Sequence, residues 1–276
     1  MSLKKYDTEK VIFNEGKATM SYFDSDRGFL LFFKQELDEL SKNKISPKIL
    51  DIGCGAGAKT KALKKIFLAF HFEGCDISKQ AVKKAKIKPQ GVKFFTADAQ
   101  RLPLKSGQYD VVIMNSVLDH TKRPHLCLKE CHRVLKKGGL FLFTDPIEAD
   151  LTTIHGQLYR FEFFREMRKD YCGHYHAFNK KYLEKLFKKA GFKIEKQVFD
   201  WFFFAQVVDV FYYPILGLFG KGPEFNIRSY VFKNNSFSAK VLRIIRDVVT
   251  FILNTESRLT RAIPLGFFTY VKARKP

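Results

Sequence analysis

The stretch KILDIGCGAGAKT, residues 48–60, constrains the fold of this chain more than any other feature. Its apolar start ends in Asp51, and Gly53, Gly55 and Gly57 follow at every second position. Glycines at the carboxyl end of a buried strand allow a tight turn and let a ligand approach the main chain closely. The N–H groups that open the next helix can then bind a carboxylate or a phosphate of that ligand. A glycine-rich turn alone is a weak signal for any one ligand.

From residue 48 onward, short β-rich segments alternate with lysine-rich helical segments. This alternation predicts a parallel sheet with right-handed crossover connections. The predicted strands of this pattern are 48–53, 70–78, 92–99, 109–116 and 139–146. A helix over 179–192 and a strand over 193–201 follow, and a seventh strand is predicted over 267–275. The run VVIM at 111–114 is typical of a strand that is buried on both faces.

We divide the chain into four parts on this pattern. Residues 1–45 are predicted to form an N-terminal helical cap, and residues 46–200 the ligand-binding core. Residues 201–263 are predicted to form a helical insert that caps the substrate side, and residues 264–276 to return to the core as its last strand. The apolar positions of the N-terminal part follow a helical stripe, which comprises Phe29, Leu30, Phe33, Leu37 and Leu40.

The insert contains the apolar run 201–220, which raises the question of a membrane span. Gln206 and Asp209 lie near the middle of this run, where a charge is costly in lipid, and Pro214 interrupts it. We therefore interpret the insert as a buried cap over an active site, and we keep contact with a membrane interface and a membrane span as the alternatives.

The chain carries a formal charge of +21, from 49 Lys and Arg against 28 Asp and Glu. Such a charge attracts nucleic acid, anionic lipid head groups or acidic small molecules. The lysines are spread along the whole chain at helical spacing, which is typical of a solvated surface. The sequence has no RNA-binding module, so nucleic acid is not the expected partner. The 30 Phe indicate an apolar cavity or surface beyond the ordinary core.

Two further acids lie at the ends of predicted strands. Asp76 ends the second strand and Asp98 ends the third, so both are expected at the sheet edge that carries the glycine turn. A carboxylate after the second strand can accept hydrogen bonds from both ribose hydroxyls, and one after the third can accept from the amine of adenine. The glycine spacing differs from that of dinucleotide-binding turns. A ligand with adenine, ribose and an amino-acid end but no phosphate fits better, and S-adenosylmethionine is such a ligand.

Four motifs in order, ILDIGCGAG, GCDIS, ADAQRLPLKSGQYDVVIMNSVLDH and CLKECHRVLKKGGLFLFTDP, resemble those of class I S-adenosylmethionine-dependent methyltransferases. They most resemble the branch that includes the ubiquinone and menaquinone biosynthesis methyltransferases. The resemblance implies an α/β fold with a Rossmann-like, seven-stranded, mostly parallel sheet, an antiparallel last strand and helices on both faces. Lys137 stands where the family often has Pro. The long helical insert before the last strand is the larger departure, and it leaves the family's usual substrates in question.

The resemblance also implies roles for residues of the site. The acid that ends the first strand orders the glycine turn, and the main chain of this turn holds the methionine end of the cofactor. The acids after the second and third strands, each with its following residue, hold the ribose and the adenine. The two residues that end the fourth strand flank the sulfonium. The alternative for each acid is a cap or turn role. The residues implied to bind the cofactor are Asp51, Gly53, Cys54, Gly55, Gly57, Asp76, Ile77, Asp98, Ala99, Asn115 and Ser116.

Methyl transfer from a sulfonium needs alignment and exclusion of water more than covalent help. A base helps only when the acceptor atom carries a proton at neutral pH. His120, which follows the fourth strand, and His174 and His176, which precede the helix at 179–192, are the candidate catalytic bases. The alternative for each histidine is a packing or surface role. No metal site is expected, because the Cys127–Cys131 pair lies in an apolar helical rhythm.

We therefore expect an S-adenosylmethionine-dependent methyltransferase that acts on a small, apolar or amphiphilic acceptor by direct methyl displacement. An RNA or protein methyltransferase that uses the basic surface, and a non-catalytic cofactor-binding protein, are the alternatives. The start of the chain, MSLKKYDTEK, lacks the apolar run of a signal peptide. The five Cys show no disulfide pattern, so the expected location is the cytoplasm, with peripheral membrane contact as an option.

Overall fold

The computed structural model of the chain describes residues 25–42, 46–200 and 265–276, and in addition 203, 204, 206, 207, 210, 248, 251, 252, 255, 256 and 259. The prediction of a helical cap therefore falls partly, and that of a helical insert mostly, outside the described residues. The division of the chain into four parts stays a prediction.

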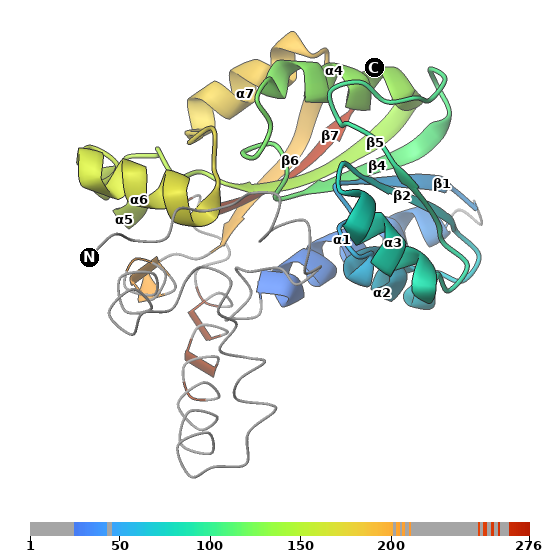
Figure 1. Ribbon diagram of the computed structural model, residues 1–276, viewed down its shortest axis with the longest axis horizontal. Helices are drawn as coiled ribbons and strands as arrows, with labels where there is room; N and C mark the ends of the chain where they lie inside the picture. The colour runs from blue at the N-terminus through green and yellow to red at the C-terminus, as the bar shows by residue number, and fades with distance from the viewer. Residues whose placement is uncertain are drawn as a thin grey trace.

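The core is one seven-stranded sheet in the order β3-β2-β1-β4-β5-β7-β6 (Figure 1). Neighbouring strands from β3 to β5 run parallel, and β7 runs antiparallel to both β5 and β6. The α/β fold class with an antiparallel last strand is thus confirmed. The strands are β1 (Lys48–Ile52), β2 (His71–Asp76), β3 (Lys93–Thr96), β4 (Tyr109–Asn115), β5 (Leu135–Pro146), β6 (Lys193–Asp200) and β7 (Phe268–Arg274).

Helices cover both faces of this sheet. Figure 1 shows α4 and α7 on one face and α1, α2 and α3 on the other, while α5 and α6 lie beyond the end of the sheet to which β5 runs. The sequence did not predict α5 and α6. The helices are α1 (Ser25–Lys42), α2 (Ala58–Ile66), α3 (Lys79–Ile87), α4 (Pro124–Val134), α5 (Ile154–Leu158), α6 (Glu162–Cys172) and α7 (Lys180–Lys189).

The central strands are apolar throughout because both of their faces are buried. In β5, Leu140 and Leu142 pack into the core beneath α1, α2 and α3, whereas Phe141 and Phe143 pack into the core beneath α4 and α7. The VVIM run of β4 alternates between the same two cores. This alternation holds the carboxyl ends of the parallel strands in register at one edge, where the connecting loops carry the site.

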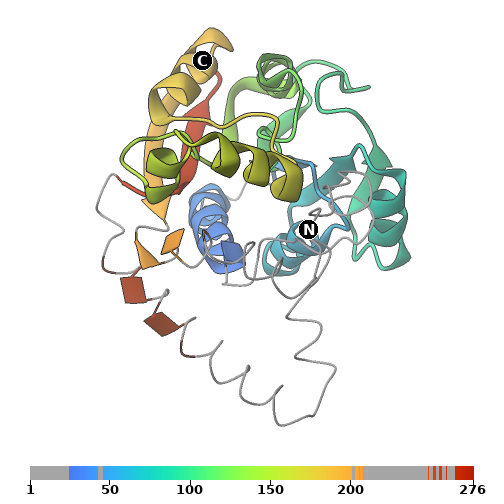
Figure 2. The same cartoon turned by 60° about the vertical axis from the view of Figure 1, so that its left-hand side comes forward.

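Helix α1 packs on the sheet beside α2, and Figure 2 shows the same neighbours after a rotation of 60°. Phe33 and Leu37 of the predicted apolar stripe are buried, and Phe32 is buried beside them. Leu40 is half-buried against the same core. Each fully buried side chain of this kind contributes about 2 kcal/mol. The helix is thus anchored to the sheet by its apolar face.

Candidate functional site

The turn between β1 and α2 is fixed to the end of the neighbouring strand. The amides of Gly53 and Cys54 donate to the carbonyl oxygen of Cys75, over 2.7 and 3.0 Å. Gly53, Gly55 and Gly57 have φ values of 77°, 54° and 76°, which lie in the left-handed region that favours glycine. The glycine spacing therefore reflects a turn that other residues adopt only with strain.

The three glycines meet different surroundings. A Cβ on Gly53 would lie 2.2 Å from Cγ2 of Val117, and a Cβ on Gly57 would lie 2.5 Å from Cζ of Phe94. These two glycines are required by internal packing. A Cβ on Gly55 would have no atom within 4 Å among the described residues. No described residue covers the turn at Gly55, which leaves room for a ligand to approach the main chain there.

Asp51 joins the end of β1 to the start of α2. Its buried carboxylate accepts a hydrogen bond from Oγ1 of Thr60 at 2.5 Å. Burial raises the pKa of Asp51 to about 7. Its position and its partner fit the expected role of ordering the glycine turn.

Asp76 holds the same turn from β2. Its Oδ2 accepts from the amide of Gly55 at 2.8 Å, and its Oδ1 accepts from the amide of Ser78 at 2.9 Å. Burial raises the pKa of this carboxyl above its ordinary value. A carboxylate offers about four acceptor positions, so Asp76 can accept further hydrogen bonds from a ligand that lies against Gly55.

The residues after β2 and β3 complete the same edge of the sheet. Ile77 is an apolar side chain with 53% exposure, although it directly follows a buried strand. Asp98 is half-buried, and its Oδ1 accepts from the amide of Gln100 at 2.8 Å. Ala99 is half-buried beside it. Ile77 offers an apolar surface and Asp98 a hydrogen-bond acceptor, and an adenine ring and its edge require groups of these two kinds.

Asn115 and Ser116 end β4 on the other side of β1, and both are half-buried. Ser116 has a φ of 50°, and its amide donates to the carbonyl oxygen of Thr144 at 2.8 Å. A positive φ is uncommon for a residue other than glycine and often marks a functional position. The loop that follows carries Asp119 and His120.

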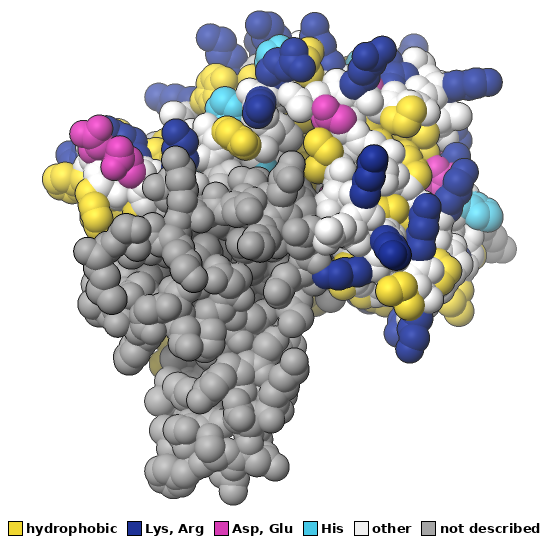
Figure 3. Space-filling model, viewed as in Figure 1, with side chains coloured by type: hydrophobic (Ala, Val, Ile, Leu, Met, Phe, Trp, Pro, Cys, Tyr) yellow, Lys and Arg dark blue, Asp and Glu magenta, His cyan; other side chains and the backbone are white. Residues whose placement is uncertain are grey.

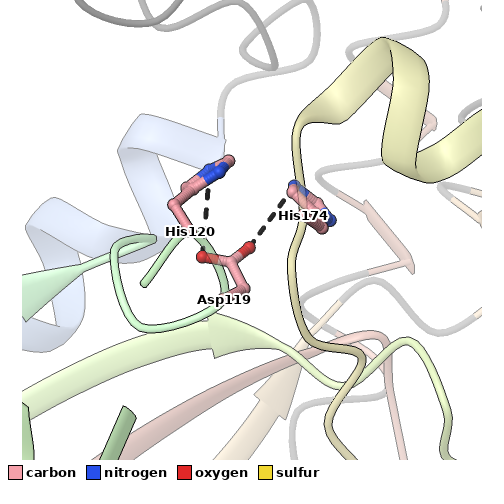
Figure 4. Close-up of side chains that lie close together, drawn as sticks. All are labelled: Asp119, His120 and His174. Carbon is pink, nitrogen blue, oxygen red and sulfur yellow. Dashed lines mark ion pairs between the residues drawn. The ribbon is translucent and has the colours of Figure 1, made fainter. Parts of the chain in front are cut away.

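Two of the three predicted histidines converge on one carboxylate (Figure 4). Nε2 of His174 lies 3.3 Å from Oδ2 of Asp119, and Nε2 of His120 lies 3.8 Å from Oδ1. Nδ1 of His120 lies 3.1 Å from the carbonyl oxygen of Gly173. His176 is set apart, since its Nε2 lies 3.2 Å from the carbonyl oxygen of Lys122. The structure thus brings together residues that lie more than fifty positions apart.

A buried chain of charges continues from His174. Its Nδ1 lies 3.0 Å from Oε1 of Glu148, and Nε of Arg168 donates to the same oxygen at 2.7 Å. Burial by itself would raise the pKa of Glu148, but Arg168 and His174 lower it well below the ordinary range. Asp145 accepts from the amides of Val117 and Asp119, each at 3.1 Å. Sequence reasoning missed Glu148, Arg168 and Asp145.

Residues 50–143 match the protein family described as Methyltransferase domain. This region is a class I S-adenosylmethionine-dependent methyltransferase domain. The methyltransferase domain uses S-adenosylmethionine as its methyl donor. The open side of Gly55, with the carboxylate of Asp76 bonded to the same residue, fits a ligand of this kind.

The methyltransferase domain has relatives with different acceptors. The chain is 28% identical over 180 residues to the uncharacterized protein MJ1123 of Methanocaldococcus jannaschii. This match covers 65% of this chain and 72% of that protein. It is 31% identical over 112 residues to a malonyl-(acyl-carrier protein) O-methyltransferase of Legionella pneumophila, and this match spans 39% of each chain. Because the match leaves most of that enzyme uncovered, its acceptor is not carried over.

Among solved structures, the chain is similar to phosphoethanolamine N-methyltransferase 2 of Haemonchus contortus in complex with S-adenosyl-L-methionine. The identity is 20%, the TM-score is 0.54, and the match covers 88% of this chain and 52% of that chain. A likeness at this identity shows the fold alone. The residue roles in this chain therefore stay predictions, argued from its own geometry.

Proposed function

We propose that this chain transfers the methyl group of S-adenosylmethionine to a small-molecule acceptor. The observation that carries this proposal is the turn at Gly55, which is open toward a ligand and bonded to the carboxylate of Asp76. The same edge of the sheet carries an exposed apolar side chain at Ile77. These three residues, Gly55, Asp76 and Ile77, would contact the aminoacyl end, the ribose and the adenine of S-adenosylmethionine, in that order.

In this proposal the residues act by holding and orienting the donor. The main chain of Gly53, Cys54, Gly55 and Gly57 faces its methionine end, and Asp51 keeps that turn in place. Asp76 accepts from the ribose hydroxyls, and Ile77 covers one face of the adenine. The remaining residues hold the adenine edge and flank the sulfonium, and they are Asp98, Ala99, Asn115 and Ser116.

When bound, S-adenosylmethionine supplies a methyl group on a sulfonium, which a nucleophile displaces directly. The chain must then align the acceptor and exclude water. A base is needed only where the acceptor atom carries a proton. His176 lies away from the cluster at Asp119 and is the weakest of the three predicted bases. His120 and His174 converge on one carboxylate, and we assign them a different role below.

We further propose an apolar or amphiphilic acceptor that the chain meets at an anionic membrane surface. Leu151, Phe161 and Phe163, around α5 and α6, are large apolar side chains that remain exposed. Among the described residues, no helix combines the length and the apolar character that crossing a membrane requires. The net charge of +21 favours an anionic head group. A contact with the membrane surface suits these features.

The cofactor role is tested at Asp76. Asp76→Ala removes the acceptor for the ribose and should raise the dissociation constant of S-adenosylmethionine by about tenfold or more, because a hydrogen bond to a charged group is worth about 1.5–3 kcal/mol. Isothermal titration calorimetry measures this constant. Asp38→Ala, an exposed position on α1, serves as the matched control. Unchanged affinity in folded Asp76→Ala protein would contradict the ribose role.

The acceptor proposal is tested by flotation. The full chain should float with vesicles of phosphatidylglycerol and phosphatidylcholine at low salt, and should remain unbound with phosphatidylcholine alone. Lipid extracts added with S-adenosylmethionine should then stimulate release of S-adenosylhomocysteine. Absence of flotation removes the membrane contact. Binding of S-adenosylmethionine without acceptor-dependent release for any lipid, small molecule, RNA or protein would favour the non-catalytic alternative.

A further inference from the structure

The carboxylate of Asp119 lacks the partners that its burial demands. The residue is 1% exposed, and neither Oδ1 nor Oδ2 accepts a hydrogen bond from the part of the chain that the structure describes. A buried charge without a compensating group costs several kcal/mol. Asp119 has two imidazoles within ion-pair distance but accepts a hydrogen bond from neither, so a positive group that contacts both of its oxygens would complete its surroundings.

Two imidazole nitrogens face this carboxylate from different segments. Nε2 of His174 and Nε2 of His120 lie 3.3 and 3.8 Å from its two oxygens. One ligand atom from each of the three residues can be chosen so that all lie within 4.8 Å of one another. Ligands of one tetrahedral ion, bound at about 2.0–2.1 Å, lie about 3.3 Å apart. The distance between Asp119 and His174 already matches this value. The other two distances must shorten, by up to about 1.5 Å, when an ion binds.

The opposite nitrogen of each ring faces an oxygen atom of the protein. Nδ1 of His120 lies 3.1 Å from the carbonyl oxygen of Gly173, which can only accept a hydrogen bond. This contact places the proton on Nδ1 and leaves the lone pair on Nε2, toward Asp119. Nδ1 of His174 lies 3.0 Å from Oε1 of Glu148. Metal-binding histidines are usually oriented in this way, by a carbonyl or a carboxylate behind the ring.

The charges around the cluster leave room for a cation. Three buried carboxyl groups, those of Asp119, Asp145 and Glu148, lie within one network. The guanidinium of Arg168 pairs with one of them. The three acids outnumber the one permanently charged cation of this network, the guanidinium of Arg168. A divalent ion would supply further positive charge beside these acids.

We propose that Asp119, His120 and His174 bind a divalent transition-metal ion through one carboxylate and two imidazoles. Two nitrogen ligands favour Zn²⁺ or Fe²⁺ over Mg²⁺ and Ca²⁺, which prefer oxygen. Three protein ligands leave a fourth position open on a tetrahedral ion. The site is independent of the proposed methyl transfer, which requires no metal, and it departs from the expectation that the chain has no metal site.

The test uses the full chain after treatment with a chelator and dialysis. Zn²⁺ is titrated in competition with a chromophoric zinc indicator, and one equivalent should bind with sub-micromolar affinity. Mg²⁺ in large excess should not compete. Co²⁺ should give the visible absorption of a tetrahedral site with nitrogen and oxygen ligands. S-adenosylmethionine is left out, so this experiment can fail or succeed separately from the test at Asp76.

The variants locate the ion. Asp119→Asn and His120→Ala should each weaken Zn²⁺ binding at least about tenfold, since even residues that only orient metal ligands affect affinity by about 10–100-fold. His176→Ala changes a nearby histidine outside the cluster and should bind Zn²⁺ like the wild type. Circular dichroism checks folding. If Asp119→Asn does not fold, His120→Ala decides, because the side chain of His120 is partly exposed at 14%.

Three results would overturn the proposal. The first is less than one equivalent of Zn²⁺ bound at concentrations at which the indicator is saturated. The second is equal affinity in wild type and folded His120→Ala protein. The third is an equal loss of affinity in His176→Ala, which would place the ion elsewhere. Binding of one equivalent that both cluster variants weaken and His176→Ala retains supports it.

Discussion

The glycine turn divides two tasks among residues that look alike in the sequence. Gly53 and Gly57 lie against Val117 and Phe94, so the fold itself needs them to lack a side chain. Among the residues that the structure describes, no atom lies within 4 Å of the place where a Cβ on Gly55 would project. The same backbone conformation thus serves packing at two positions, and at the third we propose that it lets the methyl donor approach the main chain.

Alanine at these positions should separate folding from binding. Gly55→Ala should lower the free energy of unfolding by only about 1–2 kcal/mol, the cost of a left-handed φ, yet raise the dissociation constant of S-adenosylmethionine at least about tenfold. Gly53→Ala adds a clash at 2.2 Å with Val117 and should destabilise the fold by a further 1–3 kcal/mol. Urea unfolding and calorimetric titration measure the two effects. Tight binding by Gly55→Ala would show that the donor does not approach this residue.

The sequence predicted which residues lie at the ends of the strands. It did not predict which side chains from distant segments contact one another. Asp51, Asp76 and Asp98 follow apolar runs, so their place at one edge follows from a parallel sheet. The meeting of Asp119 with His174 depends on how the segment after α6 returns over the loop after β4. The hydrophobic periodicity of the sequence does not predict the path of this segment. Nor does the sequence indicate that a histidine contacts an acid 55 positions away.

At the scale of elements, an ion pair fixes α1 to the far edge of the sheet. Glu36 is buried, and its two oxygens lie 2.9 Å from Nζ of Lys196 in β6 and 2.7 Å from Nζ of Lys272 in β7. Burial by itself would raise the pKa of Glu36, but the two lysines outweigh it and lower the pKa below its ordinary value. The helix is therefore held by charge as well as by its apolar face.

Glu36→Gln should lower the free energy of unfolding by about 2 kcal/mol, because the two lysines lose a charged acceptor. Since the folded pKa is lowered, this contribution is present above the ordinary pKa of Glu and is lost as the pH falls through the folded value. Urea unfolding at neutral and acidic pH should show the difference shrinking. Glu39→Gln, in an exposed pair on the same helix, is the control and should have almost no effect. Equal effects of both variants would contradict this role.

The elements that the sequence predicted are those with a clear apolar period. Strands β1 to β7 and helix α7 lie within a few residues of their predicted bounds, and Asn179 caps α7 as expected. Helices α5 and α6 were missed. The first has only five residues, and the second buries Phe164, Met167 and a charged residue, Arg168, while Phe163 stays exposed. A stripe that mixes charge and apolar groups in this way does not stand out in a sequence.

On the whole-molecule scale, the sheet order could be expected only from the resemblance to known methyltransferases. Alternation of strands and helices predicts a parallel sheet but leaves the order of its strands open. The distribution of positive charge agrees with the expected solvated, lysine-rich surface. Lys and Arg side chains are spread over the described part of the face in Figure 3 rather than gathered in one stripe. Such a distribution favours a general attraction to anionic surfaces over a single docking groove.

The position of β7 between β5 and β6 also affects how the protein is made. Its residues 268–274 pair with residues 140–146, which leave the ribosome more than a hundred residues earlier. Until then the edge of β5 is an unpaired apolar strand, of the kind that associates with other chains. The sheet of the nascent polypeptide therefore stays incomplete until β7 has been synthesised. We expect chaperones that bind unpaired strand edges to prevent aggregation mainly during this interval.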